Sequence, residues 1–84
     1  MNNMPKIELL KPLKRIRIKI NSNLYPWEAL IETLREFKDI CEWETNKRNG
    51  DIELLLIVKE DIDLEELTNE FMNHLLARGK ELVI

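Results

Sequence analysis

The stretch CEWETNKRNGDIELLLIVK, residues 41–59, decides the fold of this chain. Two runs suited to β-strands flank Asn49-Gly50, a dipeptide that readily takes the two positive-φ positions of a type I′ turn. A two-residue turn places Arg48 opposite Asp51 and, further from the turn, Trp43 opposite Leu56. We therefore expect a β-hairpin that turns at these two residues.

Successive side chains of a strand point to opposite faces, so this register also divides the hairpin into two faces. One face is nearly all apolar and is expected to meet the core. The other is expected to be partly wet. The core face pairs Cys41 with Val58, Trp43 with Leu56 and Thr45 with Leu54, and the wet face pairs Glu42 with Ile57, Glu44 with Leu55 and Asn46 with Glu53.

Length and composition indicate one small domain, since 84 residues that are 44% hydrophobic provide a single core. The chain has no apolar run of the roughly 18 residues that a membrane span needs and no signal-peptide pattern. We expect a soluble, cytoplasmic protein with no membrane association. Charged residues reach 35%, which favours a thermophilic source.

The residues before the hairpin predict an extension, a strand and a helix. Residues 1–12, with Pro5 and Pro12, are expected to form a partly ordered N-terminal extension whose apolar residues lie on the surface or continue an edge strand, and residues 13–84 are expected to form the domain. Residues 14–20 alternate as a strand with one solvated face. A core-facing helix is expected to begin at Pro26, with its apolar stripe at Trp27, Leu30, Ile31, Leu34 and Phe37.

After the hairpin, Asp63 is a good N-cap for a second helix, with Glu66 three residues later as its capping-box partner. Gly79 has the character of the residue that ends this helix. Residues 80–84 then have room for a short C-terminal strand, with Leu82 and Ile84 on one side. The order β-α-β-β-α, with this short C-terminal strand in addition, predicts an α+β, ferredoxin-like two-layer sandwich with an antiparallel or mixed sheet.

A search for chemistry predicts no enzyme, no metal site and no cofactor. Cys41 is the only cysteine, so it excludes an internal disulfide, and the hairpin register indicates that it is a buried small hydrophobe rather than a reactive thiol. The only histidine, His74, fits a helix boundary where the helix dipole favours it. Gly50 and Gly79 are both explained by turns, so no glycine-rich phosphate loop is present.

The best candidate binding site is the sheet face opposite the helices. The first predicted strand places three basic side chains on it, and the hairpin adds two apolar ones; these residues are Arg15, Arg17, Lys19, Leu55 and Ile57. Apolar side chains flanked by both signs of charge suit association with a second copy as a homodimer, or with a protein or peptide partner. A peptide added along a strand edge is another mode of binding.

Two further functions remain open. A small molecule could bind such a domain as a regulatory ligand. Nucleic acid could bind the basic first strand, although the aromatic residues that stack bases in RNA-binding domains of this topology are missing, and Glu42 and Glu44 would repel phosphates. We therefore expect nucleic-acid binding less than protein association.

The sequence also resembles a known family in two segments: Ile20-Asn21-Ser22-Asn23-Leu24-Tyr25-Pro26-Trp27-Glu28-Ala29-Leu30, and Asp63-Leu64-Glu65-Glu66-Leu67 followed by Glu70-Phe71-Met72-Asn73-His74-Leu75-Leu76. It is similar there to the small D-type component of His-Xaa-Ser repeat peptide-maturation systems, over roughly residues 14–78. The resemblance implies a non-catalytic accessory protein that works beside radical-SAM enzymes on a ribosomally made peptide. It carries over no catalytic residue.

Overall fold

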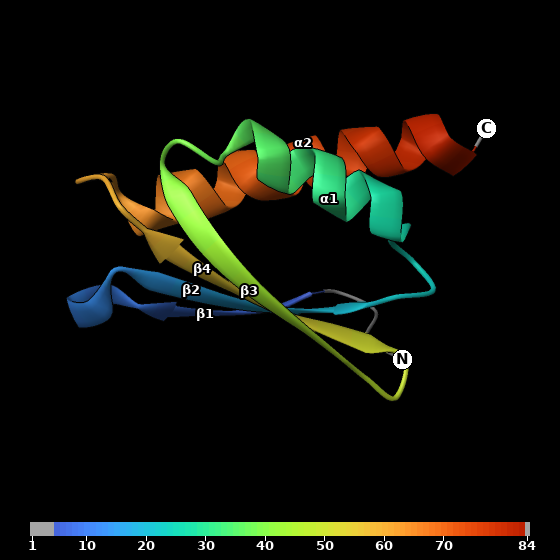
Figure 1. The fold of residues 1–84 in the computed structure, drawn as a ribbon, viewed down its shortest axis with the longest axis horizontal. Helices are drawn as coiled ribbons and strands as arrows, with labels where there is room; N and C mark the ends of the chain where they lie inside the picture. The colour runs from blue at the N-terminus through green and yellow to red at the C-terminus, as the bar shows by residue number, and fades with distance from the viewer. Residues whose placement is uncertain (1–4, 84) are drawn as a thin grey trace.

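The computed structural model describes residues 5–83 and shows two layers, an antiparallel sheet and a pair of helices that cover one of its faces (Figure 1). The sheet order is β1-β2-β4-β3. These layers confirm the predicted α+β architecture and the antiparallel sheet. The elements are β1 (Lys6–Leu10), the 3-10 turn η1 (Lys11–Leu13), β2 (Arg15–Asn21), α1 (Trp27–Glu36), β3 (Cys41–Arg48), β4 (Asp51–Val58) and α2 (Leu64–Val83).

The hairpin of β3 and β4 has the predicted turn and register. Asn49 and Gly50 have φ angles of 48° and 83°, as the two central positions of a type I′ turn require. Arg48 pairs with Asp51 and Trp43 with Leu56. The Gly50 carbonyl also accepts hydrogen bonds from the backbone N–H of Ser22 at 2.8 Å and from its hydroxyl at 2.6 Å, which ties the turn to the loop after β2.

The predicted C-terminal strand is wrong. Helix α2 continues through Gly79 to Val83, so residues 80–83 are helical, and Ile84 lies outside the described residues. Lys80, Glu81 and Leu82 all have high helix propensity, and a glycine inside a helix costs only about 1 kcal/mol, so an established helix can pass it. The position beside β2 that a terminal strand would need is also occupied by β1.

Residues 6–10 form an edge strand of the sheet. Residues 6–10 pair with β2 in an unbroken antiparallel register, in which Ile7 lies opposite Ile18 and Leu9 opposite Ile16. Of the two possibilities left open by the sequence for Ile7, Leu9 and Leu10, the edge strand is the one observed. The domain boundary expected after residue 12 stays a prediction.

The two helices begin close to the expected residues. Helix α1 starts at Trp27, one residue after the predicted Pro26, which has a non-helical ψ of 141°. Helix α2 follows Asp63, whose carboxylate accepts a hydrogen bond from the Glu65 N–H at 3.0 Å. Trp27 was predicted to face the core but is 37% exposed, and its ring lies 4.7 Å from the ammonium nitrogen of Lys47 on β3.

The core lies between the sheet and the helices. Alternate residues of β2 and β4 are buried against α1 and α2, and Tyr25, just before α1, is buried with them. Within the described residues, every buried side-chain nitrogen and oxygen has a hydrogen-bond partner. Within residues 5–83, no helix lies on the other face of the sheet, and its side chains are exposed or partly buried (Figure 1).

Candidate functional site

All five residues of the predicted binding site lie together on the helix-free face of the sheet, which we call the open face. Arg15, Arg17 and Lys19 alternate with the buried isoleucines of β2. Leu55 and Ile57 alternate with the buried residues of β4. The strand order places β2 directly beside β4, so these basic and apolar side chains are neighbours, as expected.

Two cross-strand rows define the centre of the open face. In one row, Leu55 lies between Arg17 of β2 and Glu44 of β3. In the next row, Ile57 has Arg15 and Glu42 as its neighbours. Leu55 and Ile57 are partly buried, while the four charged residues around them are exposed. The face therefore has an apolar centre with cations on one side and carboxylates on the other.

Much of the positive charge of β2 is already paired. Arg17 donates a hydrogen bond to Glu8 at 2.9 Å, and the Lys19 ammonium lies 3.6 Å from a carboxylate oxygen of Asp51. Both ion pairs are well exposed, so each adds little to stability, but each lowers the charge that a phosphate would meet. Among residues 5–83, Arg15 forms no ion pair, and neither do Glu42 and Glu44.

Strand β1 extends the open face beyond the residues that the sequence identified. Lys6, Glu8 and Leu10 lie opposite Lys19, Arg17 and Arg15 respectively. The sequence signal for this strand was weak because prolines lie at both ends of a five-residue run. Two shallow hollows of about 350 Å³ and 210 Å³ open on this face, and both are lined by Arg17 and Glu53. Their walls carry charges of both signs.

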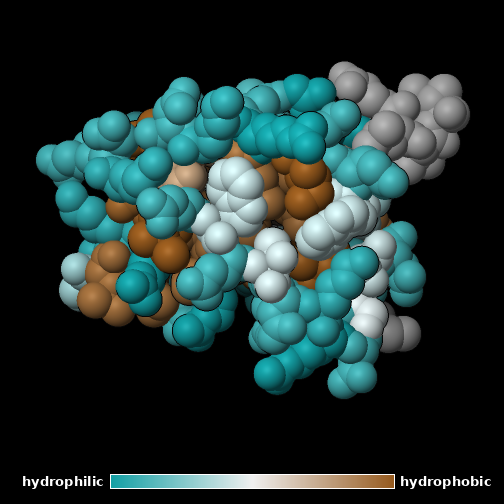
Figure 2. All heavy atoms as spheres, viewed as in Figure 1, coloured by the Kyte–Doolittle hydropathy of each residue, from teal (hydrophilic) through white to brown (hydrophobic). Residues whose placement is uncertain are grey.

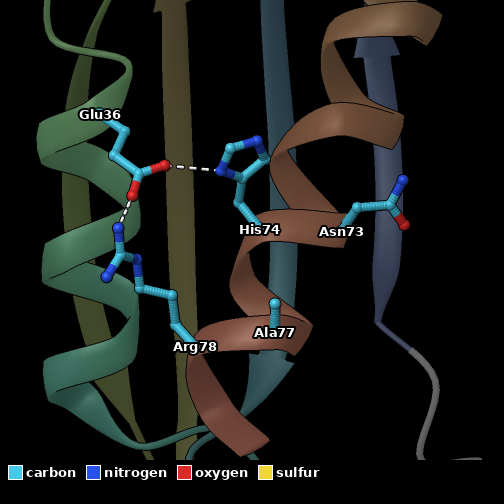
Figure 3. A pocket seen from close by; sticks show the side chains of 5 residues that line it. All are labelled: Glu36, Asn73, His74, Ala77 and Arg78. Carbon is cyan, nitrogen blue, oxygen red and sulfur yellow. Dashed lines mark hydrogen bonds and ion pairs between the residues drawn. The ribbon is translucent and has the colours of Figure 1, made fainter. Parts of the chain in front are cut away.

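A second polar cluster lies on the helix layer and was not foreseen (Figure 3). Glu36 of α1 accepts a hydrogen bond from His74 Nδ1 at 2.6 Å and also forms an ion pair with Arg78 of α2. Arg78 contacts Glu32 at 3.4 Å as well. A hollow of about 450 Å³ beside them is lined by Glu36, Asn73, His74, Ala77 and Arg78.

The contacts in this cluster link α1 to α2. The His74 ring contacts Glu36 through Nδ1 and also packs edge-on against Phe37 with 5.4 Å between centroids. Among the described residues, no serine, cysteine or lysine lines the hollow beside His74. The available sequence signal was the four-residue spacing of Glu32 from Glu36 and of His74 from Arg78, which places each pair on one helix face.

Cys41 is buried as predicted, with 1% of its surface exposed. Burial raises the pKa of its thiol above the ordinary value, and the charge of nearby Lys59 offsets part of that rise. The thiol is therefore held in its protonated, unreactive form. No group of three metal-ligating side chains occurs in the described part of the chain.

Comparison of the chain with protein-family models, with curated proteins and with solved structures finds no match. The resemblance to the D-type peptide-maturation component therefore stays a prediction from the sequence. Within residues 5–83, no helix is long and apolar enough to cross a membrane.

Proposed function

We propose that this protein is a non-catalytic association module that binds a protein or peptide partner with its open face. One observation carries the proposal: Leu55 and Ile57 lie between the arginines of β2 and the glutamates of β3. Apolar side chains at the centre supply the attraction of such a contact, and charges around them set its orientation.

The charges also describe the partner. Its contact surface has an apolar centre, an acidic side that meets Arg15, and a basic side that meets Glu42 and Glu44. A second copy of this face, related to the first by a twofold axis parallel to β4 and between the two faces, satisfies the same pattern, because its Glu42 would meet Arg15. The test below separates a foreign partner from a second copy.

The family resemblance suggests a setting for this partner. An accessory role beside a radical-SAM enzyme, on a ribosomally made peptide, needs a surface that binds a chain segment without chemistry of its own. We also interpret the order β2-α1-β3-β4-α2 as that of a ferredoxin-like sandwich. Its fourth strand is then β1, which precedes β2 in the chain instead of following α2. Identifying the neighbouring genes would support or oppose this setting directly.

The other two functions have less support. Two of the three basic side chains of β2, Arg17 and Lys19, already contact carboxylates, which weakens attraction for nucleic acid. The hollows on the open face, of about 350 Å³ and 210 Å³, are at or below the small end of the range of ligand sites, and charged side chains of both signs line them. Protein association would use both the apolar and the charged side chains of the open face.

The test compares the wild-type chain with Leu55→Ser/Ile57→Ser in sedimentation equilibrium and in pull-downs from native lysate. We expect the variant to lose at least ~10-fold in binding, while its melting temperature falls little because both side chains are only partly buried. If the species bound by the wild type is the chain itself, and Leu55→Ser/Ile57→Ser no longer binds it, the open face binds a second copy.

The matched control is Leu13→Ser/Leu24→Ser. Leu13 and Leu24 are 61% and 47% exposed and lie outside the open face, so their replacement removes apolar surface without touching the site. This control should keep full binding. A wild-type chain that is a strict monomer and recovers no partner, or equal loss in both variants, would contradict the proposal.

A further inference from the structure

The outer edge of β3 is a long strand edge without a covering segment in residues 5–83. It is the last strand of the sheet order, and its exposed part runs from Glu44 to Arg48 (Figure 1). Such an edge readily pairs with another strand unless prolines, bulges, very short length or charged side chains that the incoming strand does not match prevent it. Here the ladder with β4 is unbroken over eight residues, and β3 contains no proline.

The opposite edge of the sheet, formed by β1, is better protected against the addition of a strand. Strand β1 has five residues, follows Pro5 and ends at η1, which contains Pro12. Short length and flanking prolines both disfavour the addition of a further strand. The two edges of the sheet are therefore unequal, and β3 is the edge open to docking.

The hairpin register identifies the backbone groups that point outward. The turn places Arg48 and Asp51 in a hydrogen-bonded pair, so alternate residues of β3 from Arg48 to Glu42 direct their N–H and C=O groups at β4. The groups of Trp43, Thr45 and Lys47 point away from the sheet. An added strand must satisfy these three residues.

We propose that a second copy of this chain docks on β3 in antiparallel orientation, with Thr45 opposite Thr45 of the second copy. In this register Trp43 lies opposite Lys47 of the other copy. Every outward N–H and C=O of Trp43, Thr45 and Lys47 then finds a partner on both copies. The two sheets join into one continuous sheet with a twofold axis through Thr45, an isologous contact.

The side chains of β3 match themselves in this register. On the open face, Glu42 lies opposite Arg48 of the second copy, and twofold symmetry repeats that pair. Glu44 lies opposite Asn46, so no like charges oppose each other. On the helix side, Lys47 lies opposite the half-buried Trp43 of the second copy. The ammonium group of Lys47 already lies over the Trp27 ring of its own chain, so Trp43 provides it with a second aromatic ring.

Other registers are less favourable. A shift that brings Thr45 opposite Trp43 places Glu44 opposite Glu44, and one that brings Trp43 opposite Trp43 places Glu42 opposite Glu44. Like charges directly opposite each other destabilise a strand pair. A shift in the other direction, with Thr45 opposite Lys47, leaves the outward groups of Trp43 without a strand partner. Charge and hydrogen bonding therefore select the Thr45-centred register.

The helix side of this edge also offers apolar surface for a docked strand to cover. Figure 2, seen as in Figure 1 with β3 in front, shows apolar and intermediate side chains between the polar helix layer and the polar hairpin. Trp43 is one of the partly buried residues that pack against the core cluster. A second strand at β3 would place its own helix-side residues beside this surface.

The edge contact goes beyond the proposed function because it forms through the outer backbone edge of β3; of the residues assigned to the open-face contact, it shares Glu42 and Glu44. The edge contact leaves Leu55 and Ile57 free and brings two open faces side by side. Failure of one proposal does not affect the other, since Leu55→Ser/Ile57→Ser should leave the edge contact intact.

The first experiment uses charge reversal and sedimentation equilibrium. Glu42→Arg alone places arginine opposite arginine, and Arg48→Glu alone places glutamate opposite glutamate, each twice per dimer, so each should raise the dimer dissociation constant at least ~10-fold. An equal mixture of the two variants restores opposite charges at every such position. The mixture should therefore form a heterodimer that neither variant forms with itself.

Melting curves of both variants show whether each is folded. This control is needed because Arg48 also lies 3.8 Å from Glu53 of the same chain, so its replacement removes an ion pair within the monomer. A wild-type chain that stays monomeric at roughly millimolar concentration would overturn the proposal. So would a wild-type dimer that both reversals leave unchanged. A mixture of folded variants that stays monomeric would overturn the register.

The second experiment tests the register by disulfide formation. Thr45→Cys should crosslink on mild oxidation, because directly opposite Cα atoms lie about 5.5 Å apart in a hydrogen-bonded pair, which suits a disulfide. Lys47→Cys is the matched control, since its two copies would be offset along the strands and should not crosslink. The wild-type chain is the control for crosslinking through the buried Cys41. Crosslinking of Lys47→Cys but not of Thr45→Cys would overturn the register.

Discussion

Cys41 shows how the environment of one residue fixes its chemistry. Its side chain is 1% exposed at the start of β3, and burial raises the pKa of the thiol. The alternation of β3 was enough to predict this position. The raised pKa also means that the folded chain holds the thiol proton more tightly than the unfolded chain does, so this contribution to stability is lost as pH rises through the thiol pKa values.

We therefore expect Cys41 to react with a thiol reagent only when the chain opens. At mildly alkaline pH the native protein should react at least ~100-fold more slowly than the urea-unfolded protein. The rate of release of the coloured product, measured with and without urea, provides the check. Reaction of the folded protein at the rate of the unfolded chain would mean that the thiol is accessible.

Glu36 marks a limit of sequence reading at this scale. Its contacts with His74 and Arg78 join residues that are far apart in the chain, and the sequence assigned His74 only to a helix boundary. The relative rotation of α1 and α2 decides that these side chains meet. That rotation comes from the packing of both helices on the sheet, which a single sequence does not specify.

At the scale of elements, the two glycines have opposite roles. Gly50 has a φ of 83° in the hairpin turn, as the sequence predicted, whereas Gly79 lies inside α2 rather than at its end. The turn was predictable because Asn49-Gly50 is a local signal with a specific geometry. The helix end was not, because a glycine followed by good helix formers fits both a helix end and a helix interior.

Alanine substitutions should separate these roles. Gly79→Ala should raise stability by about 0.5–1 kcal/mol, since alanine favours the helix and its Cβ would meet only Pro26 Cδ, at 3.8 Å. Gly50→Ala should lower stability by about 1 kcal/mol or more, because alanine disfavours a positive φ. Urea unfolding of both variants measures the two effects. Destabilisation by Gly79→Ala would contradict the helical position.

At the scale of the whole molecule, the main difference from expectation is the origin of the fourth strand. Residues 80–84 alternate over too few positions to distinguish a strand from a helix end, while Pro5 and Pro12 obscured the strand between them. The register of β3 against β4 followed from the Asn49-Gly50 turn, and the residues of the open face followed from the alternation of β2 and β4. Which chain end would pair with the free edge of β2 did not.

Leu9 tests where the domain begins. It packs against the core cluster from β1, so Leu9→Asp should lower stability by about 1–2 kcal/mol. For a domain of this size that is roughly 4–16 °C in Tm, measured by thermal melting. Glu8→Ser is the control, since Glu8 and its ion-pair partner Arg17 are 58% and 57% exposed and such pairs contribute little. Equal Tm values for Leu9→Asp and the wild type would make residues 1–12 an extension.

The N-terminal origin of β1 also has a consequence for how the chain folds. The sheet consists of two pairs of strands adjacent in sequence, β1 with β2 and β3 with β4, joined by one distant pairing between β2 and β4. Residues 11–14 close the first pair, whereas a strand at the other chain end would have required a loop of roughly 60 residues. Lower contact order favours fast folding, and the first pair can form on the ribosome before the helices are synthesised.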